Sequence, residues 1–555
     1  MAFTSPQPPG YPSSSSPPDN ATLFQAFEWY LPSDAAHWRR LEAALPALQH
    51  LGLSSLWLPP ACKAGWYTGN GYDIYDLYDL GEFHQKGAVH TKWGTKAELV
   101  ALAERARERG MGVLFDTVLN HRAAADAAEE VAAVKVDPKD RTTAVEEPNV
   151  IEAWCMYEFP GRGDAYSPLK WDKRHFNGID YDHKTKTNGV WKFEDKSWAE
   201  DVDEELGNYD YLMFANVDHS HPEVRHDLFH WIQWLASQMP LSGLRLDAIK
   251  HYSAKFLKDF VRHIDATVGR NWFLVGEYWR EDSEVLAKYI EYMDHRLSLF
   301  DVRLVSNFSR LSMCPNSDLR SVFEGTLVEL KPANAVTFVT NHDTMEGQSL
   351  ETPVAAFFAP LAYALILLRA TPSLPCVFYG DLYGYTKPHG PGFIQPLPYL
   401  PLLLLARKLY AYGPQTDYFD APHCIGWTRA GHPGCHPSFG DNKGAGLAVV
   451  MTNARRWVSK WMFVGPQHAG ECWTDVLGGC PGETVVDANG WGEFKAAPRS
   501  VAVWVARNAP RREEIDICDF DCDIYGQGFR RQKAATANDL YRPRLSTQPA
   551  WMNGG

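Results

Sequence analysis

The stretch GLRLDAIKH at residues 243–251 joins a short apolar run to charged side chains. Residues two apart in a strand face the same side, so Arg245 and Asp247 share one face and the leucines take the other. A strand that is buried on both faces avoids charges unless they are paired or perform a function. The two charges are therefore either a structural ion pair or part of a site at the strand end, and this stretch alone leaves both interpretations open.

Seven further apolar runs end in polar or charged residues in the same way. They are LFQAFEWY (23–30), SSLWLPP (54–60), VLFDTVLNH (113–121), WFLVGEYW (272–279), SLFDVRL (298–304), VTFVTNHD (336–343) and LPCVFYGD (374–381). Segments with apolar residues at helical spacing lie between several of these runs, at residues 38–50, 95–110, 254–268, 283–293 and 354–369. Eight near-continuous apolar strands that alternate with helices predict an α/β fold, a closed parallel (β/α)8 TIM barrel.

Two regions depart from this alternation. Residues 122–222, after the third strand, are rich in Trp, Tyr, Gly and Asp and are longer than one helix requires, which predicts an inserted subdomain. The barrel then covers residues 21–121 and 223–410. Residues 411–507 contain short strands with turn residues between them, such as GAGLAVVMTN and SVAVWVAR, and predict a C-terminal antiparallel β-sandwich.

Both ends of the chain have the composition of poorly ordered segments. Residues 1–20 are rich in Pro and Ser, which predicts a disordered lead-in, and residues 508–555 are polar and charged. The first residues lack the basic start and apolar core of a secretory signal, so we expect a cytoplasmic protein. The net charge of −14, from 54 basic and 68 acidic side chains, comes without a long basic stretch. This distribution argues against nucleic acid and membrane surfaces as partners.

A carboxylate also follows the apolar residues of WFLVGEYW, at Glu277. An apolar setting raises a carboxyl pKa, which suits a general acid, whereas we expect Arg245 to lower the pKa of Asp247 and keep it ionised. A protonated acid beside an ionised carboxylate is the pair that divides acid and nucleophile roles in glycoside hydrolysis. Asp247 and Glu277 are therefore the candidate pair.

Two more strands end in the same kinds of side chain. VTFVTNHD ends with His342 and Asp343, and VLFDTVLNH contains Asp116 and ends with Asn120 and His121. An uncompensated buried charge is strongly destabilising, so stability alone does not explain four such strand ends. Because the carboxyl ends of barrel strands meet at one face, we expect these side chains to converge on a single site.

The four strand-end motifs DTVLNH, GLRLDAIKH, the glutamate of LVGEYW, and FVTNHD together resemble, in order and spacing, the four motif regions of the α-amylase family, glycoside hydrolase family 13. Other stretches resemble the liquefying type of this family and its non-secreted, intracellular relatives: FEWYLP, GYDIYDLYDLGEFHQKG, FPGRG, GNYDYLMFANVDHSHP, GQSLE and VFYGDLYG. The resemblance covers residues 21–507 and leaves out the lead-in and the tail.

The resemblance implies a role for each catalytic candidate. Asp247 is expected to attack the anomeric carbon and form a covalent glucosyl–enzyme, with Arg245 supporting it. Glu277 is expected to protonate the departing oxygen and then deprotonate water, and Asp343 to hold the sugar at the cleaved bond. This mechanism retains the anomeric configuration, with the two catalytic carboxyls about 5–5.5 Å apart.

The resemblance also implies a set of substrate-binding side chains. Two histidines are expected to bind hydroxyls of the same sugar, and aromatic rings to stack on it or to form the walls of the pocket. A lysine and a third histidine are expected to bind the sugar on the leaving side. In this order, the residues are His121 and His342; Tyr72, Trp29 and Trp279; and Lys250 and His251.

A calcium ion between barrel and insert is the cofactor that the resemblance implies. Calcium takes roughly 6–8 oxygen ligands, which include carboxylates, amides, backbone carbonyls and water. The matching positions are Asn120, Asp210, Asn216 and the backbone carbonyl of His251. Liquefying relatives build a second metal cluster from aspartates of the insert. Three of those positions hold other residues here and only one aspartate is kept, so we expect one calcium and no second cluster: Asn177, Ala199, Ser220 and Asp218.

The function expected from these motifs is endo-acting hydrolysis of α-1,4-glucosidic bonds in starch-type or glycogen-type glucans and maltooligosaccharides, by a monomeric enzyme. An α-glucan transglycosylase of the same family is the alternative, because water and sugar compete for the same covalent intermediate. An inactive carbohydrate-binding or scaffolding protein is a third hypothesis. The presence of all three carboxylates argues against it.

Overall fold

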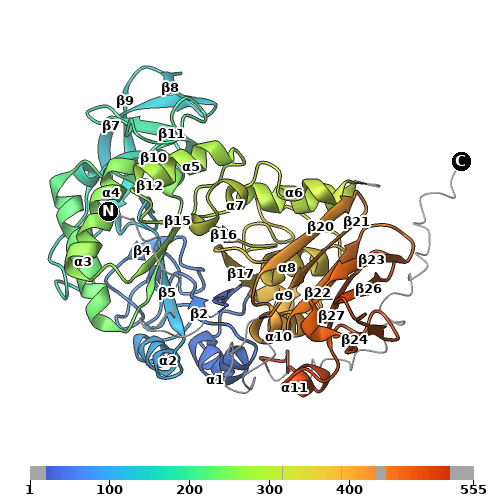
Figure 1. Ribbon diagram of the computed structural model, residues 1–555. Helices are drawn as coiled ribbons and strands as arrows, with labels where there is room; N and C mark the ends of the chain where they lie inside the picture. Colours follow the sequence, from blue (N-terminus) through green and yellow to red (C-terminus); the bar gives the residue numbers. More distant parts are fainter. Residues whose placement is uncertain (1–19, 315–316, 389–390, 432–444, 526–555) are drawn as a thin grey trace, which may run out of the picture.

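The computed structural model describes residues 20–314, 317–388, 391–431 and 445–525 of the 555-residue chain (Figure 1). The predicted lead-in lies outside the described residues except for Asn20. None of the helices in the described ranges combines the length and the apolar character that crossing a membrane requires.

All eight predicted strands form one closed parallel barrel. In chain order they are β1 (Leu23–Gln25), β2 (Ser55–Trp57), β5 (Gly112–Thr117), β13 (Gly243–Leu246), β14 (Phe273–Gly276), β15 (Ser298–Phe300), β16 (Ala335–Thr337) and β17 (Leu374–Phe378). The barrel closes because β17 pairs with β1, with Cys376 opposite Leu23. Every residue of these strands is buried, which explains their continuous apolar sequences.

Helices surround the barrel at the places that the sequence predicts. The five expected segments correspond to α1 (His37–His50), α2 (Lys96–Glu108), α4 (Ala254–Thr267), α5 (Ser283–Tyr292) and α8 (Ala359–Leu368). The outer layer also contains α3 (Pro222–Gln238), α6 (Val302–Met313) and α10 (Leu400–Tyr410). Each outer helix packs an apolar stripe inward, as α4 does with Phe256, Leu257 and Phe260. The helix α8 contacts the C-terminal sheet as well as the barrel side, so all but one of its residues are buried.

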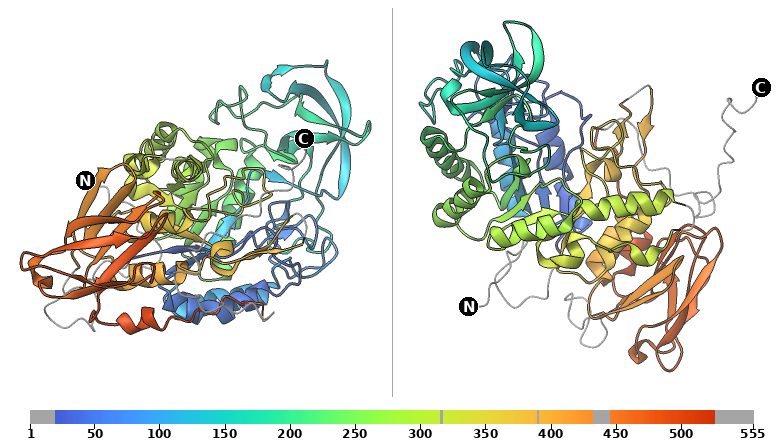
Figure 2. Two further views of the ribbon diagram at one scale, coloured as in Figure 1. Left: turned by 90° about the vertical axis from the view of Figure 1, so that its right-hand side faces the viewer. Right: turned by 90° about the horizontal axis from the view of Figure 1, so that it is seen from above.

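The insert after the third strand is an antiparallel sheet that stands above the barrel (Figures 1 and 2). Its order is β6-β12-β10-β11-β7-β8, with β9 paired to β7. The first pair in this order, β6 (His121–Arg122) and β12 (Ala215–Val217), connects the sheet to the barrel. The others are β7 (Ala127–Asp137), β8 (Asp140–Ala144), β9 (Asn149–Met156), β10 (Phe176–Asp182) and β11 (Thr187–Phe193).

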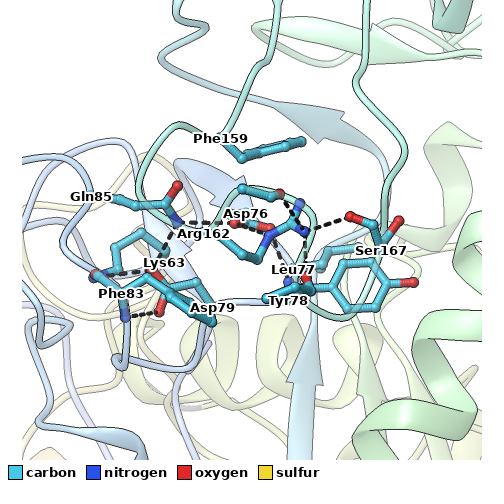
Figure 3. A network of polar contacts seen from close by, with 12 residues as sticks. Lys63, Asp76, Leu77, Tyr78, Asp79, Phe83, Gln85, Phe159, Arg162 and Ser167 are labelled. Carbon is cyan, nitrogen blue, oxygen red and sulfur yellow. Dashed lines mark hydrogen bonds and ion pairs between the residues drawn. The ribbon is translucent and has the colours of Figure 1, made fainter.

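A buried network of charges attaches the insert to the barrel loop that follows Tyr72. Arg162 of the insert donates to Asp76 at 2.7 Å, and both side chains are 1% exposed. Gln85 donates to Asp76 and to Asp79, and the Lys63 ammonium pairs with Asp79 (Figure 3). Because these charges are buried and are paired with one another, the network fixes the insert relative to the barrel.

The C-terminal region contains two antiparallel sheets, as expected for the predicted sandwich. The larger has the order β20 (Gln415–Ala421), β21 (Cys424–Arg429), β22 (Leu447–Thr452), β27 (Val501–Ala506), β24 (Cys472–Asp475) and β25 (Thr484–Val485). The smaller pairs β23 (Val458–Phe463) with β26 (Trp491–Ala496). This region and the insert lie on opposite sides of the barrel (Figure 2).

The start of the tail differs from the expectation of little order after residue 507. The helix α11 (Arg512–Asp516) forms there, and Phe520 and Cys522 are buried. The Phe520 ring lies 5.6 Å from the ring of Tyr383, which follows the last barrel strand. The few apolar residues of this polar segment therefore pack back onto the barrel. Residues 526–555 lie outside the described ranges, and the numerical domain boundaries stay a prediction.

Candidate active site

Five charged side chains meet at the carboxyl end of the barrel. Asp116 belongs to β5 and Arg245 to β13, while Asp247 and Glu277 directly follow β13 and β14. Asp343 lies in the loop after β16. The positions that the sequence places at four strand ends are thus brought to one site, because parallel strands of a closed barrel end on the same face.

Arg245 is the centre of this cluster. One terminal nitrogen, Nη1, donates to Asp116 Oδ1 at 2.8 Å and to Asp247 Oδ1 at 2.6 Å. The other, Nη2, donates to Glu277 Oε2 at 2.7 Å. The arginine side chain is only 1% exposed, so a single buried guanidinium fixes the relative positions of three carboxyl groups.

The charge balance of the cluster differs from the sequence expectation for Asp247. Burial raises the pKa of Asp247 well above its ordinary value; Arg245 opposes this effect, and the neighbouring carboxylates add to it. Burial likewise raises the pKa of Asp116, and it raises that of Asp343 to about 7. The prediction of a lowered pKa was wrong because it left out burial, which outweighs the attraction to Arg245, and because two further carboxyls share that arginine. Burial and the neighbouring carboxylates thus favour the protonated form of Asp247, and its ionised form depends on Arg245.

The backbone also holds Glu277 in place. The Ala248 N–H donates to Glu277 Oε2 at 3.0 Å, and the Glu277 N–H donates to the Leu246 carbonyl at 2.9 Å. Ala248 adopts a left-handed conformation with φ of 50°, which is unfavourable for a residue with a side chain. This turn directs its N–H toward Glu277, so local strain is part of how the site is built.

Three stacked rings lie next to the carboxylates. Trp29 and Tyr72 stack with centroids 5.8 Å apart, and Tyr72 and His342 with centroids 5.0 Å apart and planes at 6°. The Tyr72 hydroxyl donates to Asp116 Oδ2 at 2.8 Å, which ties the rings to the charged cluster. The stack joins residues from three separate loops and provides an aromatic surface of the kind that sugar rings pack against.

The two predicted histidines of the site are neutral. Burial lowers the pKa of His121 to about 4, and it lowers that of His342 well below its ordinary value. The nitrogens of His121 contact the Tyr72 carbonyl at 2.7 Å and Asn120 Oδ1 at 3.2 Å. His342 contacts Gln25 through Nδ1 at 2.9 Å, and its Nε2 lies 3.3 Å from Asp343 Oδ2. Both rings are therefore positioned by neighbours, and His121 also fixes the loop that carries Tyr72.

Lys250, His251 and Trp279 lie at the ends of β13 and β14. The Lys250 ammonium donates to the Trp279 carbonyl at 3.0 Å, which joins the two strand ends. His251 Nδ1 contacts the Tyr209 carbonyl of the insert at 2.9 Å, and its own carbonyl accepts from Asn120 at 3.0 Å. These contacts thus lie where the insert meets the ends of β13 and β14.

Two residues of the cluster are absent from the predicted set of site residues. Asp116 is placed by the sequence in a polar strand end, but its contacts with Arg245, Tyr72 and Trp57 become visible only in the structure. Gln25 orients His342 from the first strand. Both are polar residues inside continuously apolar strands, which is the signal that identifies them.

The predicted calcium ligands form two hydrogen-bonded pairs at the junction of insert and barrel. Asn120 donates to the His251 carbonyl, and Asn216 donates to Asp210 Oδ1 at 3.3 Å. Burial raises the pKa of Asp210 to about 7, so this carboxylate lacks a compensating charge. Within the described ranges, Asn216 Oδ1 is buried with no hydrogen-bond partner. A buried carboxylate, an unpaired amide oxygen and a backbone carbonyl are ligands that fit calcium.

A second group of possible metal-binding side chains has a different chemistry. The ligand atoms of His175, His221 and Glu223 lie within 4.8 Å of one another. The Asp172 N–H donates to His175 Nδ1 at 2.9 Å, however, and the other ring nitrogen lies 3.2 Å from Glu223 Oε2. Both nitrogens of His175 are thus used within the protein, and the group offers few of the oxygen ligands that calcium prefers.

The chain matches known protein families over most of its length. A family model described as the α-amylase catalytic domain matches residues 32–417, and one described as the α-amylase C-terminal domain matches residues 447–505. The chain is 44% identical over 490 residues to an α-amylase of Bacillus licheniformis, which covers 88% of this chain and 94% of that protein. It is 39% identical over 504 residues to the cytoplasmic α-amylase of Escherichia coli (strain K12), over 88% and 99% of the two chains.

Solved structures share the fold at lower identity. The structure of α-amylase from Geobacillus thermoleovorans, complexed with acarbose, has a TM-score of 0.57 and 17% identity, and the match covers 88% of this chain and 98% of that one. An Anoxybacillus α-amylase has a TM-score of 0.58 at 16% identity, over 88% and 98% of the two chains. At these identities the likeness supports the three-part architecture alone.

Proposed function

Because the chain belongs to the α-amylase family, we propose that Asp247, Glu277 and Asp343 are the residues with which it cleaves its substrate. The chain is an α-amylase, an endo-acting hydrolase of α-1,4-glucans. The observation that carries the residue assignment is the single guanidinium of Arg245, which binds the Asp247 and Glu277 carboxyls from its two terminal nitrogens.

In the first step, Asp247 attacks the anomeric carbon and Glu277 protonates the glycosidic oxygen. A bond forms between an Asp247 oxygen and the sugar, while the bond to the leaving glucan breaks and that glucan takes the proton. Glu277 Oε2 is held by Arg245 and by the Ala248 N–H, so Oε1 is the atom that exchanges the proton.

In the second step, water replaces the leaving glucan. Glu277, now ionised, removes a proton from water as the water oxygen attacks the anomeric carbon, and the bond to Asp247 breaks. Glu277 regains its proton and Asp247 its charge. Two displacements at the same carbon retain the α-configuration, and Arg245 stabilises the ionised forms that alternate between its two partners.

Asp343 and His342 hold the sugar whose bond is cleaved. Asp343 is 22% exposed at the mouth of the cluster and accepts hydrogen bonds from ring hydroxyls when it is ionised. The stack of Trp29, Tyr72 and His342 packs against the apolar face of the same sugar. A sugar held in this way is positioned for in-line attack by Asp247.

The assignment is tested with Asp247→Asn, Glu277→Gln and Asp343→Asn. Each variant should lower kcat on maltoheptaose by at least about 1000-fold, within the range for loss of a nucleophile or general acid. Thermal unfolding should show that each variant still folds. Proton NMR should detect the α-anomer as the first product of the wild-type enzyme. A variant with wild-type activity, or a β-anomer as first product, would refute the assignment.

Calcium is proposed as the cofactor, with Asp210, Asn120, Asn216 and the His251 carbonyl as its ligands. When bound, calcium would neutralise the charge of the buried Asp210, and ligand residues from both the insert and the barrel would hold it. The chain would supply the Asp210 carboxylate, the amide oxygens of Asn120 and Asn216, and the backbone carbonyl of His251. One of those oxygens, Asn216 Oδ1, is buried without a partner in the described part of the chain.

A second metal cluster is not part of this proposal. Lys196 donates to Asp218 Oδ2 at 2.8 Å, and both side chains are at most 15% exposed. Ser220 satisfies the other Asp218 oxygen through its N–H and its hydroxyl. The ammonium of Lys196 therefore supplies the positive charge at the one aspartate that is kept.

Two further expectations belong to the proposal. A cytoplasmic location is supported by the relative from Escherichia coli that is named cytoplasmic. Cell fractionation with an antibody tests it. The monomeric state stays a prediction, which light scattering coupled to gel filtration decides.

A further inference from the structure

One acidic loop of the insert, which contains Asp203, lies against the strand end that carries Glu277. Asp203 in this loop has a side chain with 0% exposure. Its Oδ2 accepts from the Tyr278 hydroxyl at 2.8 Å, and its Oδ1 accepts from Arg280 Nη1 at 2.5 Å. These partners flank Trp279, so one buried carboxylate holds both sequence neighbours of this tryptophan.

The backbone of Asp203 also connects the insert to the end of β13. Its N–H donates to the Lys250 carbonyl at 3.1 Å, and its carbonyl accepts from the Tyr209 N–H at 3.0 Å. The Glu205 N–H donates to Asp203 Oδ1 at 2.9 Å. A single residue therefore ties the segment after β13, the segment after β14 and the insert loop together.

Asp203 is ionised in this position. Burial raises its pKa, but the Glu205 N–H, Arg280 and Tyr278 lower it more, so its pKa lies below the ordinary value. A buried carboxylate with three polar contacts is strongly stabilised only while all its partners are present. We call Asp203 and the three groups that its carboxylate contacts, on Tyr278, Arg280 and Glu205, the clamp.

Glu205, two residues further on, holds the Lys250 ammonium. Lys250 Nζ donates to Glu205 Oε2 at 2.8 Å and to the Trp279 carbonyl at 3.0 Å, and it lies 4.8 Å from the Tyr209 ring centroid. The Lys250 side chain is 7% exposed, whereas Glu205 is 50% exposed. The glutamate thus faces solvent, and the lysine is fixed behind it.

We infer that Asp203 and Glu205 are positioning residues that set the leaving-side wall of the cleft, formed by Lys250 and Trp279. The inference rests on the proposed function, which places the departing glucan next to Glu277. Neither residue touches the reacting atoms. They control how well the enzyme binds the glucosyl units beyond the cleaved bond, both as leaving groups and as acceptors that compete with water.

Two substrates separate this role from damage to the catalytic centre. Maltoheptaose needs the leaving-side wall, because its leaving group is a sugar chain. 2-Chloro-4-nitrophenyl maltotrioside has an activated phenol as leaving group and needs the wall much less. A change confined to the wall therefore lowers kcat/KM for the first substrate and leaves the second nearly unchanged.

The variants are Asp203→Asn and Glu205→Gln, with Glu204→Gln as the matched control because that side chain is exposed on the same loop. Asp203→Asn should lower kcat/KM on maltoheptaose by about 10- to 100-fold, the effect of a lost charged hydrogen bond. Glu205→Gln should lower it by about 3- to 10-fold. Both should change hydrolysis of the aryl substrate by less than about twofold, reduce the share of transfer products, and leave the pH profile in place.

Arg280→Gln provides a second test of the clamp. The double variant with Asp203→Asn should lose no more activity than Asp203→Asn alone, since both changes break the same contact. Equal losses on both substrates, or wild-type activity on maltoheptaose, would overturn the inference. A failure of the proposed function is distinguishable, because it would appear as turnover in Glu277→Gln, whatever the result for the clamp.

Discussion

Arg245 Nη1 lies 2.6 Å from Asp247 Oδ1. Its Nη2 lies 2.7 Å from Glu277, so one planar group spans the two residues assigned to attack and protonation. Replacing Arg245 with Lys keeps the positive charge but removes the two separate terminal nitrogens, because an ammonium has a single donor nitrogen. We expect kcat/KM on maltoheptaose to fall by about 100- to 1000-fold, the cost of a lost preorganised donor. Steady-state kinetics measures this, and a loss below threefold would contradict the bridging role.

Asp343 should make the folded protein less stable as pH rises. Its pKa is about 7 in the folded protein and ordinarily 3.8, so folding binds a proton between these pH values. The folded protein therefore has the full stabilising contribution of the protonated Asp343 below pH ~4. This contribution decreases as pH rises and is lost by pH ~7. Asp343→Asn removes the titration and should therefore raise the unfolding free energy at pH 8 but not at pH 4.

The size of this gain has an upper limit. The difference between the ordinary and the folded pKa of Asp343 corresponds to at most ~4 kcal/mol of unfolding free energy. Because the side chain is partly exposed, we expect a gain of about 1–3 kcal/mol. Thermal unfolding of both proteins at pH 4, 6 and 8 measures the difference. An equal difference at all three pH values would show that Asp343 does not titrate in this range.

Arg162 should be required for the attachment of the insert. Arg162→Met leaves Asp76 buried and without its main counter-charge, a change that costs about 3–5 kcal/mol. Limited proteolysis should then cut residues 122–222 faster than in the wild type. Arg174→Met is the matched control, because Arg174 is an insert arginine that pairs with Asp172 at 62% exposure. Equal protease resistance of both variants would exclude the network as the attachment.

Asn216 should limit calcium affinity. Asn216→Asp adds a carboxylate to a site with one, and we expect the calcium dissociation constant to fall by about 10-fold or more. Asp210→Asn should weaken binding by a similar factor. Calorimetry on protein stripped with a chelator measures both, with the exposed Asp195→Asn as control. Unchanged affinity in Asn216→Asp and Asp210→Asn would place the ion elsewhere.

Sequence reasoning predicted the barrel well because each strand carries its own signal. The run 243–246 is apolar except for Arg245, and Asp247 follows directly where β13 ends. The same holds for β14 and Glu277. Residues that act at the ends of strands can therefore be located without a structure, since position along the strand decides where they point.

Contacts between segments could not be predicted in the same way. The expectation of a lowered Asp247 pKa took only Arg245 into account. In the structure the carboxyl is also buried, and Arg245 contacts three carboxyls. Asp203 and Glu205 lie in a loop rich in acidic residues, where no periodicity distinguishes a buried carboxylate from exposed ones. The packing of Phe520 onto Tyr383 was missed because a polar segment with few apolar residues has the composition of a disordered tail.

Mass spectrometry of a trapped intermediate tests the central assignment most directly. Glu277→Gln, incubated with an α-maltosyl fluoride, lacks the base that activates water, so the covalent intermediate should accumulate. We predict a protein mass increased by one maltosyl unit, with the modification on Asp247 after peptide digestion. A modification on Asp343 or Asp116, or fluoride release without any adduct in both this variant and the wild type, would contradict Asp247 as the nucleophile.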